Sequence, residues 1–158
     1  MSFLRFLMLL SLVVWIGGII FFSFVVAPTV FSVLPTRHLA GSVVNRSLGA
    51  LHWMGILSGV VFLLSSMLYS RLSVGSLQPL AARHVLIVLM LLLTLASQFG
   101  ISPKMSTLRS SMAEIDTVPL TNPSRMQFDA LHVWSVRLEG GVFFLGLIAV
   151  YFTARRFG

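Results

Sequence analysis

Four apolar runs divide the chain, and each is long enough to cross the hydrocarbon core of a membrane. They cover about residues 3–27, 48–69, 83–101 and 130–154. A membrane-spanning helix needs about 20 mostly apolar residues. In lipid, a span must satisfy its own backbone hydrogen bonds, which makes each of these runs a helix. The sequence therefore predicts an all-α integral membrane four-helix bundle, with residues 1–158 forming a single transmembrane domain.

The composition agrees with this class of protein and excludes another. The 158 residues are 57% hydrophobic and 9% charged, whereas soluble domains are about 25% charged. The formal net charge is +7, but the basic residues sit singly at the ends of apolar runs, where they meet lipid phosphates. We therefore expect a lipid bilayer as partner and no nucleic acid. The absence of Cys leaves only His, Met, carboxylate or backbone oxygen as metal ligands.

Four spans place both termini on one side of the membrane. The basic residues on that side are Arg5, Arg71, Arg83, Arg155 and Arg156. Those on the other side are Arg37, Arg46, Lys104, Arg109 and Arg125. The two sides tie in number, but the terminal side holds its charges closer to the helix ends. The positive-inside rule then predicts cytoplasmic termini, and we expect a bacterial inner (plasma) membrane.

The two halves of the chain resemble each other. The first span ends in "VAPTVFSVL" and the third in "GISPKMSTL", and the second and fourth spans both open with Ala-Leu-His. One interpretation is a duplication that gives a 2+2 bundle with a pseudo-two-fold axis along the membrane normal. The other is a chance likeness between apolar helices that have proline near their ends.

Two histidines share this Ala-Leu-His context, in "GALHWMG" and "DALHVWS". If the repeat holds, His52 and His132 face each other across the bundle, between the second and fourth spans. Glu139 lies on the same helical stripe as His132. Charges within a span are costly in lipid, so Glu139 and Arg137 should both face protein. The sequence thus predicts one inner polar site formed by His52, His132 and Glu139.

Two cofactors suit such a site. In haem b, His52 and His132 would be the axial ligands, with Arg46 and Arg125 near the propionates. A copper ion would take the same two histidines, joined by Met54 or Met126.

Gly55 and Gly59 form a G-x-x-x-G pattern on the stripe of His52. Such glycines either allow close helix packing or leave room for a flat group such as a porphyrin. The spacing alone does not choose between these two interpretations.

The motifs "LVVWIGGIIFFSFVVAP", "LGALHWMG" and "FDALHVWS" resemble those of an uncharacterised family of four-helix bacterial membrane proteins. A eukaryotic transmembrane protein linked to platinum-drug resistance belongs to the same group. More distantly, the chain is similar to the membrane domains of copper resistance protein D and to the haem-binding J-type protoporphyrinogen oxidase. That oxidase uses a histidine in its first helix, whereas the run 3–27 has none. The resemblance implies a small membrane protein in redox or metal handling and no established reaction.

Two other classes of function stay open. One is a cofactor-free accessory subunit of a larger membrane complex, or a homo-oligomer, which would lose stability without its partner. The other is a small transporter, which the charged residues of the fourth span would permit. Whether the protein is an enzyme is left undecided by the sequence.

Overall fold

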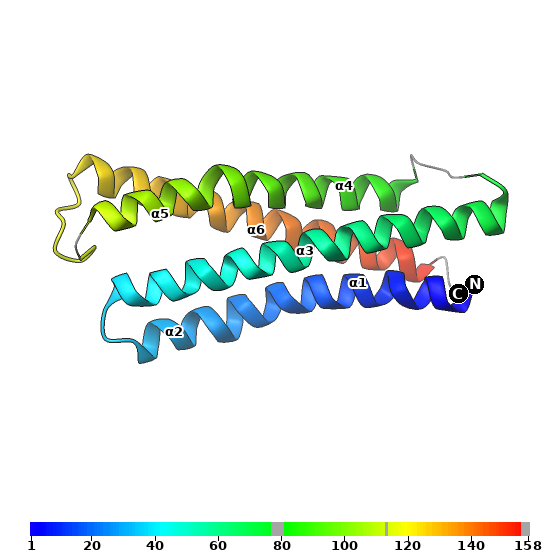
Figure 1. Ribbon diagram of the computed structural model, residues 1–158, viewed down its shortest axis with the longest axis horizontal. Helices are drawn as coiled ribbons and strands as arrows, with labels where there is room; N and C mark the ends of the chain where they lie inside the picture. Colours follow the sequence, from blue (N-terminus) through cyan, green and yellow to red (C-terminus); the bar gives the residue numbers. More distant parts are fainter. Residues whose placement is uncertain (77–80, 113, 156–158) are drawn as a thin grey trace.

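The computed structural model describes residues 1–76, 81–112 and 114–155, and within them it consists of four long helices lying side by side (Figure 1). The elements are α1 (Ser2–Phe21), η1 (Phe22–Val26), α2 (Ala27–Val33), α3 (Arg37–Val74), α4 (Ala82–Leu95), η2 (Ala96–Ile101), α5 (Ser102–Ser111) and α6 (Pro123–Arg155). The continuous helices Ser2–Val33, Arg37–Val74, Ala82–Ser111 and Pro123–Arg155 are each long and apolar enough to cross a membrane. The predicted all-α four-helix membrane bundle is confirmed.

The first and third spans continue through Pro28 and Pro103, past the ends at residues 27 and 101 that the apolar runs predicted. Proline lacks an N–H, and in an α-helix its ring collides with the carbonyl four residues earlier. Here each proline is preceded by a π-helical stretch, η1 or η2. Ala27 N–H bonds to Phe22 O, and Ser102 N–H bonds to Ser97 O. This shift of the hydrogen bonds places Pro28 and Pro103 in the first turn of a new α-helical segment, where proline is tolerated.

The helix pairs support the two-fold repeat. The π-helical stretches occur at matching places in the two halves, directly before Pro28 and Pro103. The closest packing between elements is of α1 on α3 and of α4 on α6, so each half contributes one packed pair. Because the spans run on past their predicted ends, the connection after the first span is only residues 34–36, much shorter than the sequence suggested.

The helices are longer than a bilayer requires, so one end of the bundle projects beyond the hydrocarbon. The four spans contain between 30 and 38 residues, whereas about 20 suffice. Counting about 20 residues from the arginines at the terminal end puts the opposite boundary near Leu51 on α3 and Val136 on α6. Trp53 and Trp134 lie at this level and are 56% and 55% exposed, as tryptophans in an interfacial belt are.

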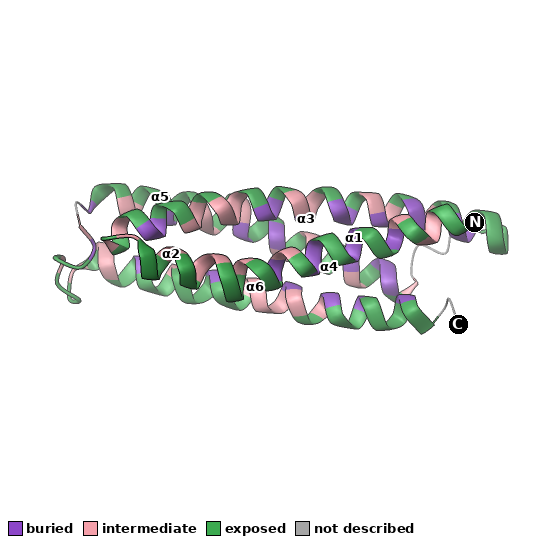
Figure 2. Cartoon of the chain, turned by 90° about the horizontal axis from the view of Figure 1, so that it is seen from below, coloured by how far each residue is buried: buried purple, intermediate pink, exposed green. Residues whose placement is uncertain are grey.

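Trp15 fills the space that two glycines leave on α3. The indole is 2% exposed, and a Cβ added at Gly55 or Gly59 would collide with its ring atoms. The flat group beside these glycines is therefore a side chain of the protein, which confirms the helix-packing interpretation of the G-x-x-x-G pattern. Buried residues lie along the inner sides of the helices, and exposed ones cover the outer sides (Figure 2).

A buried polar cluster joins the two halves near the terminal end. Arg83 donates from Nε to Ser66 Oγ at 2.6 Å and from Nη2 to Ser70 Oγ at 2.7 Å. His84 Nε2 lies 2.7 Å from the same Ser66 Oγ. His84 is buried as well. These bonds fix α4 against α3.

Candidate functional site

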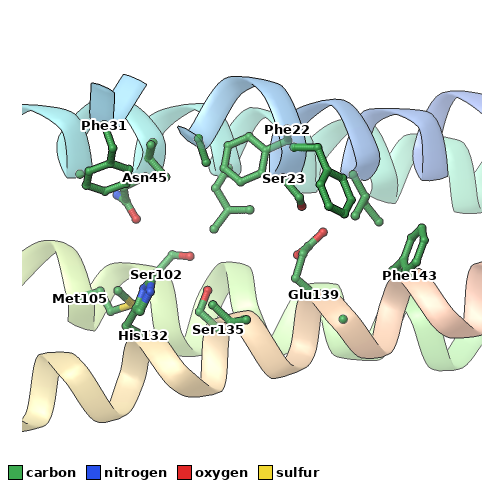
Figure 3. Close-up of a pocket in the computed structure, with 18 of the residues that line it drawn as sticks. Phe22, Ser23, Phe31, Asn45, Ser102, Met105, His132, Ser135, Glu139 and Phe143 are labelled. Atoms are coloured by element: carbon green, nitrogen blue, oxygen red, sulfur yellow. The ribbon is translucent and has the colours of Figure 1, made fainter. Parts of the chain in front are cut away.

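A cavity of about 620 Å³ opens between the first span and α6, in the half of the bundle that carries the connections 34–36 and 114–122 (Figure 3). Much of its wall is apolar, with Phe22, Phe24, Phe31, Phe143 and Phe144. The polar lining residues are Ser23, Asn45, Ser102, Arg109, His132, Ser135 and Glu139. The cavity extends across the estimated membrane boundary, because Glu139 lies just inside the level of Trp134 and His132 just outside it.

The polar side chains stand at two levels along the cavity. Ser23 and Glu139 point toward each other across it, and Asn45 and His132 lie closer to the loops (Figure 3). His132 and Glu139 are seven residues apart on α6, which is two helical turns, or roughly 10 Å along the axis. A long molecule could therefore meet polar groups at two points while its body contacts the phenylalanines.

Glu139 also belongs to a buried hydrogen-bonded group behind the cavity wall. His52 is 1% exposed; its Nδ1 lies 2.8 Å from Gln98 Oε1, and its Nε2 lies 3.3 Å from Glu139 Oε2. Since the Gln98 carbonyl can only accept, Nδ1 carries a hydrogen and donates it. The Nε2 contact then needs one further proton, either on Glu139 with His52 neutral or on His52 with Glu139 ionised. One proton thus lies between the two residues.

The structure does not bring His52 and His132 together, contrary to the expectation of a shared pair of imidazoles. His52 has both ring nitrogens at hydrogen-bonding distance from protein atoms, and its partner on α6 is Glu139. His132 lies two turns closer to the loops, where it lines the cavity. The two histidines lie at different heights along the bundle axis. The part of α3 before His52 is longer than the part of α6 before His132, so His52 lies deeper than His132.

The comparison with protein families identifies the group to which the chain is related. The family of a domain of unknown function, DUF4149, matches residues 10–114. The chain belongs to the DUF4149 family. No curated protein and no solved structure matches it. The predicted membership of an uncharacterised family is therefore confirmed. The DUF4149 match includes His52, Gln98 and Arg109, and it ends before His132 and Glu139.

The methionines and arginines proposed as further ligands lie outside the cavity of this DUF4149 protein. Met54 packs against the core beside Gly18, and Met126 is exposed. Arg46 is exposed on α3. Arg125 donates from Nη1 to Ile115 O and from Nε to Asp129 Oδ2 at 3.2 Å, so it holds the segment around Ile115 against α6. Within the described ranges, no three His, Asp or Glu side chains gather as a metal site.

Several polar residues of the site were missed in the sequence, among them Gln98, Asn45 and Arg109. Gln98 interrupts an apolar run beside Ser97, a signal that could have marked it. Asn45 and Arg109 lay in segments interpreted as loops, but the extended α3 and α5 carry both to the cavity. Arg109 is the only Lys or Arg among the lining residues that the structure describes.

Arg137 faces away from the protein, contrary to expectation, whereas Glu139 faces inward as predicted. The Arg137 guanidinium carbon lies 5.4 Å from the centre of the exposed Trp134 ring. Residues two apart on a helix point to different sides, and at the level of the tryptophan belt a long arginine side chain reaches the polar interface.

Arg137→Gln should therefore change stability little. We expect a loss of about 0.5 to 1 kcal/mol, the value of an exposed cation–π contact, measured as thermal unfolding in detergent. A loss several times larger would mean that Arg137 has a buried partner.

Proposed function

We propose that this protein binds an amphipathic, membrane-soluble small molecule in the cavity between the first span and α6. The observation that carries the proposal is the cavity itself. Its volume of about 620 Å³ lies within the range of about 300 to 1,000 Å³ usual for ligand sites. Such sites are mostly apolar with a few polar groups that orient the ligand, and this one has that lining at the depth where lipid tails meet headgroups.

Haem b belongs to this class of molecule, since it has a flat apolar body and two propionates. Of the two predicted axial ligands, only His132 lines the cavity, while the ring nitrogens of His52 are engaged by Gln98 and Glu139. A haem held here would use His132 as its imidazole and Arg109, in place of Arg46 and Arg125, beside its propionates. Copper fits less well, because Met54 and Met126 both lie away from His132.

A small transporter is the second candidate, and the His52–Glu139 pair favours it. A proton shared within a membrane bundle, on the wall of a ligand cavity, could couple release of the molecule to protonation. If the protein is instead a cofactor-free accessory subunit, we expect an empty cavity and a partner protein that copurifies with it.

The test fills the cavity with a side chain that has room to fit. Gly140 lines the cavity, and a Cβ added there would meet no atom within 4 Å, so Gly140→Leu should occupy the site without a clash. Gly17→Leu is the matched control, since Gly17 is equally open but lies outside the lining. We expect molecules extracted from the purified protein to fall at least about tenfold in Gly140→Leu and to persist in Gly17→Leu.

Mass spectrometry of the extract and a visible spectrum identify the molecule. A Soret band would indicate haem, and a lipid or isoprenoid mass would indicate a colourless ligand. A wild-type protein that yields no bound molecule by either method would refute the proposal and leave the accessory-subunit alternative as the better one.

We also propose cytoplasmic termini and a bacterial inner membrane as the location. The support is the row of arginines close to the helix ends on the terminal side, Arg5, Arg71, Arg83 and Arg155. The test fuses a reporter that is active only in the cytoplasm to each terminus. Both fusions should be active if the proposed orientation is right.

A further inference from the structure

We propose that the molecule in the cavity is an anion, and that Arg109 binds its carboxylate or phosphate. This inference rests on the proposed function, because it names the chemistry of the ligand for the same cavity. The residues that carry it are Arg109, its neighbour Gly41 and the four acidic side chains of the chain.

Arg109 is a half-buried cation on the cavity wall. It lies near the end of α5, where Nη1 donates to Gly41 O at 2.5 Å, and the guanidinium carbon lies 5.1 Å from the centre of the Phe128 ring. A guanidinium has five N–H donors in a planar fork. The Gly41 carbonyl takes one of these donors, and the Arg109 side chain is part of the cavity lining.

Every acidic side chain of the protein is engaged elsewhere. The sequence has four Asp and Glu residues. Glu114 accepts a hydrogen bond from the backbone of His38, Asp116 pairs with Arg37, Asp129 pairs with Arg125, and Glu139 contacts His52. Over residues 1–76, 81–112 and 114–155, none of them lies within ion-pair distance of Arg109. Within these ranges the chain offers Arg109 no counter-charge, so an anionic ligand would supply one.

The backbone of α3 is shaped to admit the guanidinium. A Cβ added at Gly41 would lie 2.7 Å from Arg109 Nη2 and 2.9 Å from Cζ, closer than van der Waals contact allows. A side chain at this position would push the end of the flexible Arg109 side chain aside, so we assign Gly41 the role of a positioning residue. A planar guanidinium held in a fixed orientation suits two-pronged binding of a carboxylate or phosphate.

The depth of Arg109 matches the polar end of an amphiphile. The residue lies on the part of the bundle that projects past the tryptophan level, with Asn45 and His132 as polar neighbours in the lining. Phe22 and Phe143 lie further along the cavity toward the membrane interior (Figure 3). An acid bound at Arg109 would extend its apolar body along these rings, where lipid tails would otherwise lie.

The experiment compares an acid with its uncharged ester. A dansyl-labelled fatty acid and its methyl ester are titrated into the protein in nanodiscs, with empty nanodiscs subtracted. We expect the acid to bind about tenfold or more tightly than the ester, and Arg109→Gln to remove this preference by weakening the acid far more than the ester. Arg109→Lys should retain part of it, and Gly41→Ala should weaken the acid alone. Arg46→Gln, an exposed arginine on the same side, is the control and should change neither probe.

Each outcome separates this inference from the proposed function. If acid and ester bind equally to the wild type, or if Arg109→Gln keeps the preference, the cavity binds ligands but the anion inference fails. If neither these two probes nor haem and its dimethyl ester bind, or if Gly140→Leu does not displace the probes that bind, both proposals fail.

The same comparison with haem and haem dimethyl ester, followed by the Soret absorption, distinguishes the two sources of an anionic group. Preference for haem over its ester, lost in Arg109→Gln, would assign the propionates of a porphyrin. Preference with the fatty acid alone would assign a lipid-like acid.

Discussion

Gly55→Leu is expected to prevent formation of the folded bundle. A Cβ at this position would collide with the Nε1, Cε2 and Cδ1 atoms of Trp15, and the rigid indole is almost fully buried and cannot turn aside. Overpacking in protein cores typically costs about 1 to 3 kcal/mol and sometimes more. At Gly55 even a single added Cβ collides with the indole, and leucine adds three more carbons. We therefore expect the free energy of unfolding to fall by at least about 3 kcal/mol. Gel filtration and thermal unfolding in detergent would show aggregation or a large fall in the unfolding temperature.

Two controls decide whether the contact with Trp15 is the cause. Gly17→Leu makes the same change on the neighbouring helix, where a Cβ meets open space, and it should leave stability nearly unchanged. Trp15→Ala alone should also destabilise, by about 3 to 5 kcal/mol in a well-packed core. The double variant Gly55→Leu/Trp15→Ala should be more stable than the sum of its two single losses predicts, because the leucine then fills the space that the indole has vacated. Strict additivity would contradict the packing described here.

His52→Leu is expected to destabilise the protein by roughly 2 to 5 kcal/mol, because it leaves two polar side chains without partners. Gln98 and Glu139 both bond to the imidazole, and each unmet buried polar group costs about 1 to 3 kcal/mol. The measurement is thermal unfolding in detergent.

A second substitution makes this prediction specific to the pair. Glu139→Leu combined with His52→Leu replaces both members by apolar side chains, which in buried pairs often recovers the lost stability. We expect the double variant to be more stable than His52→Leu alone. If the double variant is less stable than His52→Leu alone, Glu139 must have a further partner besides His52.

The spans were predictable because hydropathy depends only on composition along the chain. The apolar runs 48–69 and 130–154 lie inside α3 and α6, and the runs 3–27 and 83–101 begin within two residues of the observed helices. The helix ends were not predictable in the same way. Proline normally marks a helix boundary, and the sequence does not show that a π-helical stretch can absorb Pro28 or Pro103.

The pairing of His52 was missed for a different reason. Periodicity gives the face of a helix on which a residue lies, and on that basis Glu139 was correctly placed toward the interior. It does not give the axial shift of one helix against another. A shift of two turns exchanges His132 for Glu139 as the neighbour of His52, and that shift depends on how far α3 and α6 extend past the membrane. Arg109 was missed because the segment that carries it, α5, was expected to be a loop after the third span.

The π-helical stretches η1 and η2 each hold an extra residue relative to an α-helix. Deleting one residue there would restore a regular α-helix, and the segments on either side would keep nearly the same faces, because a π-helical stretch absorbs its extra residue locally. Pro28 or Pro103 would then stand inside that α-helix, where its ring collides with the carbonyl four residues earlier. Each π-helical stretch and the proline after it therefore depend on each other, and evolution would have to lose or gain them together.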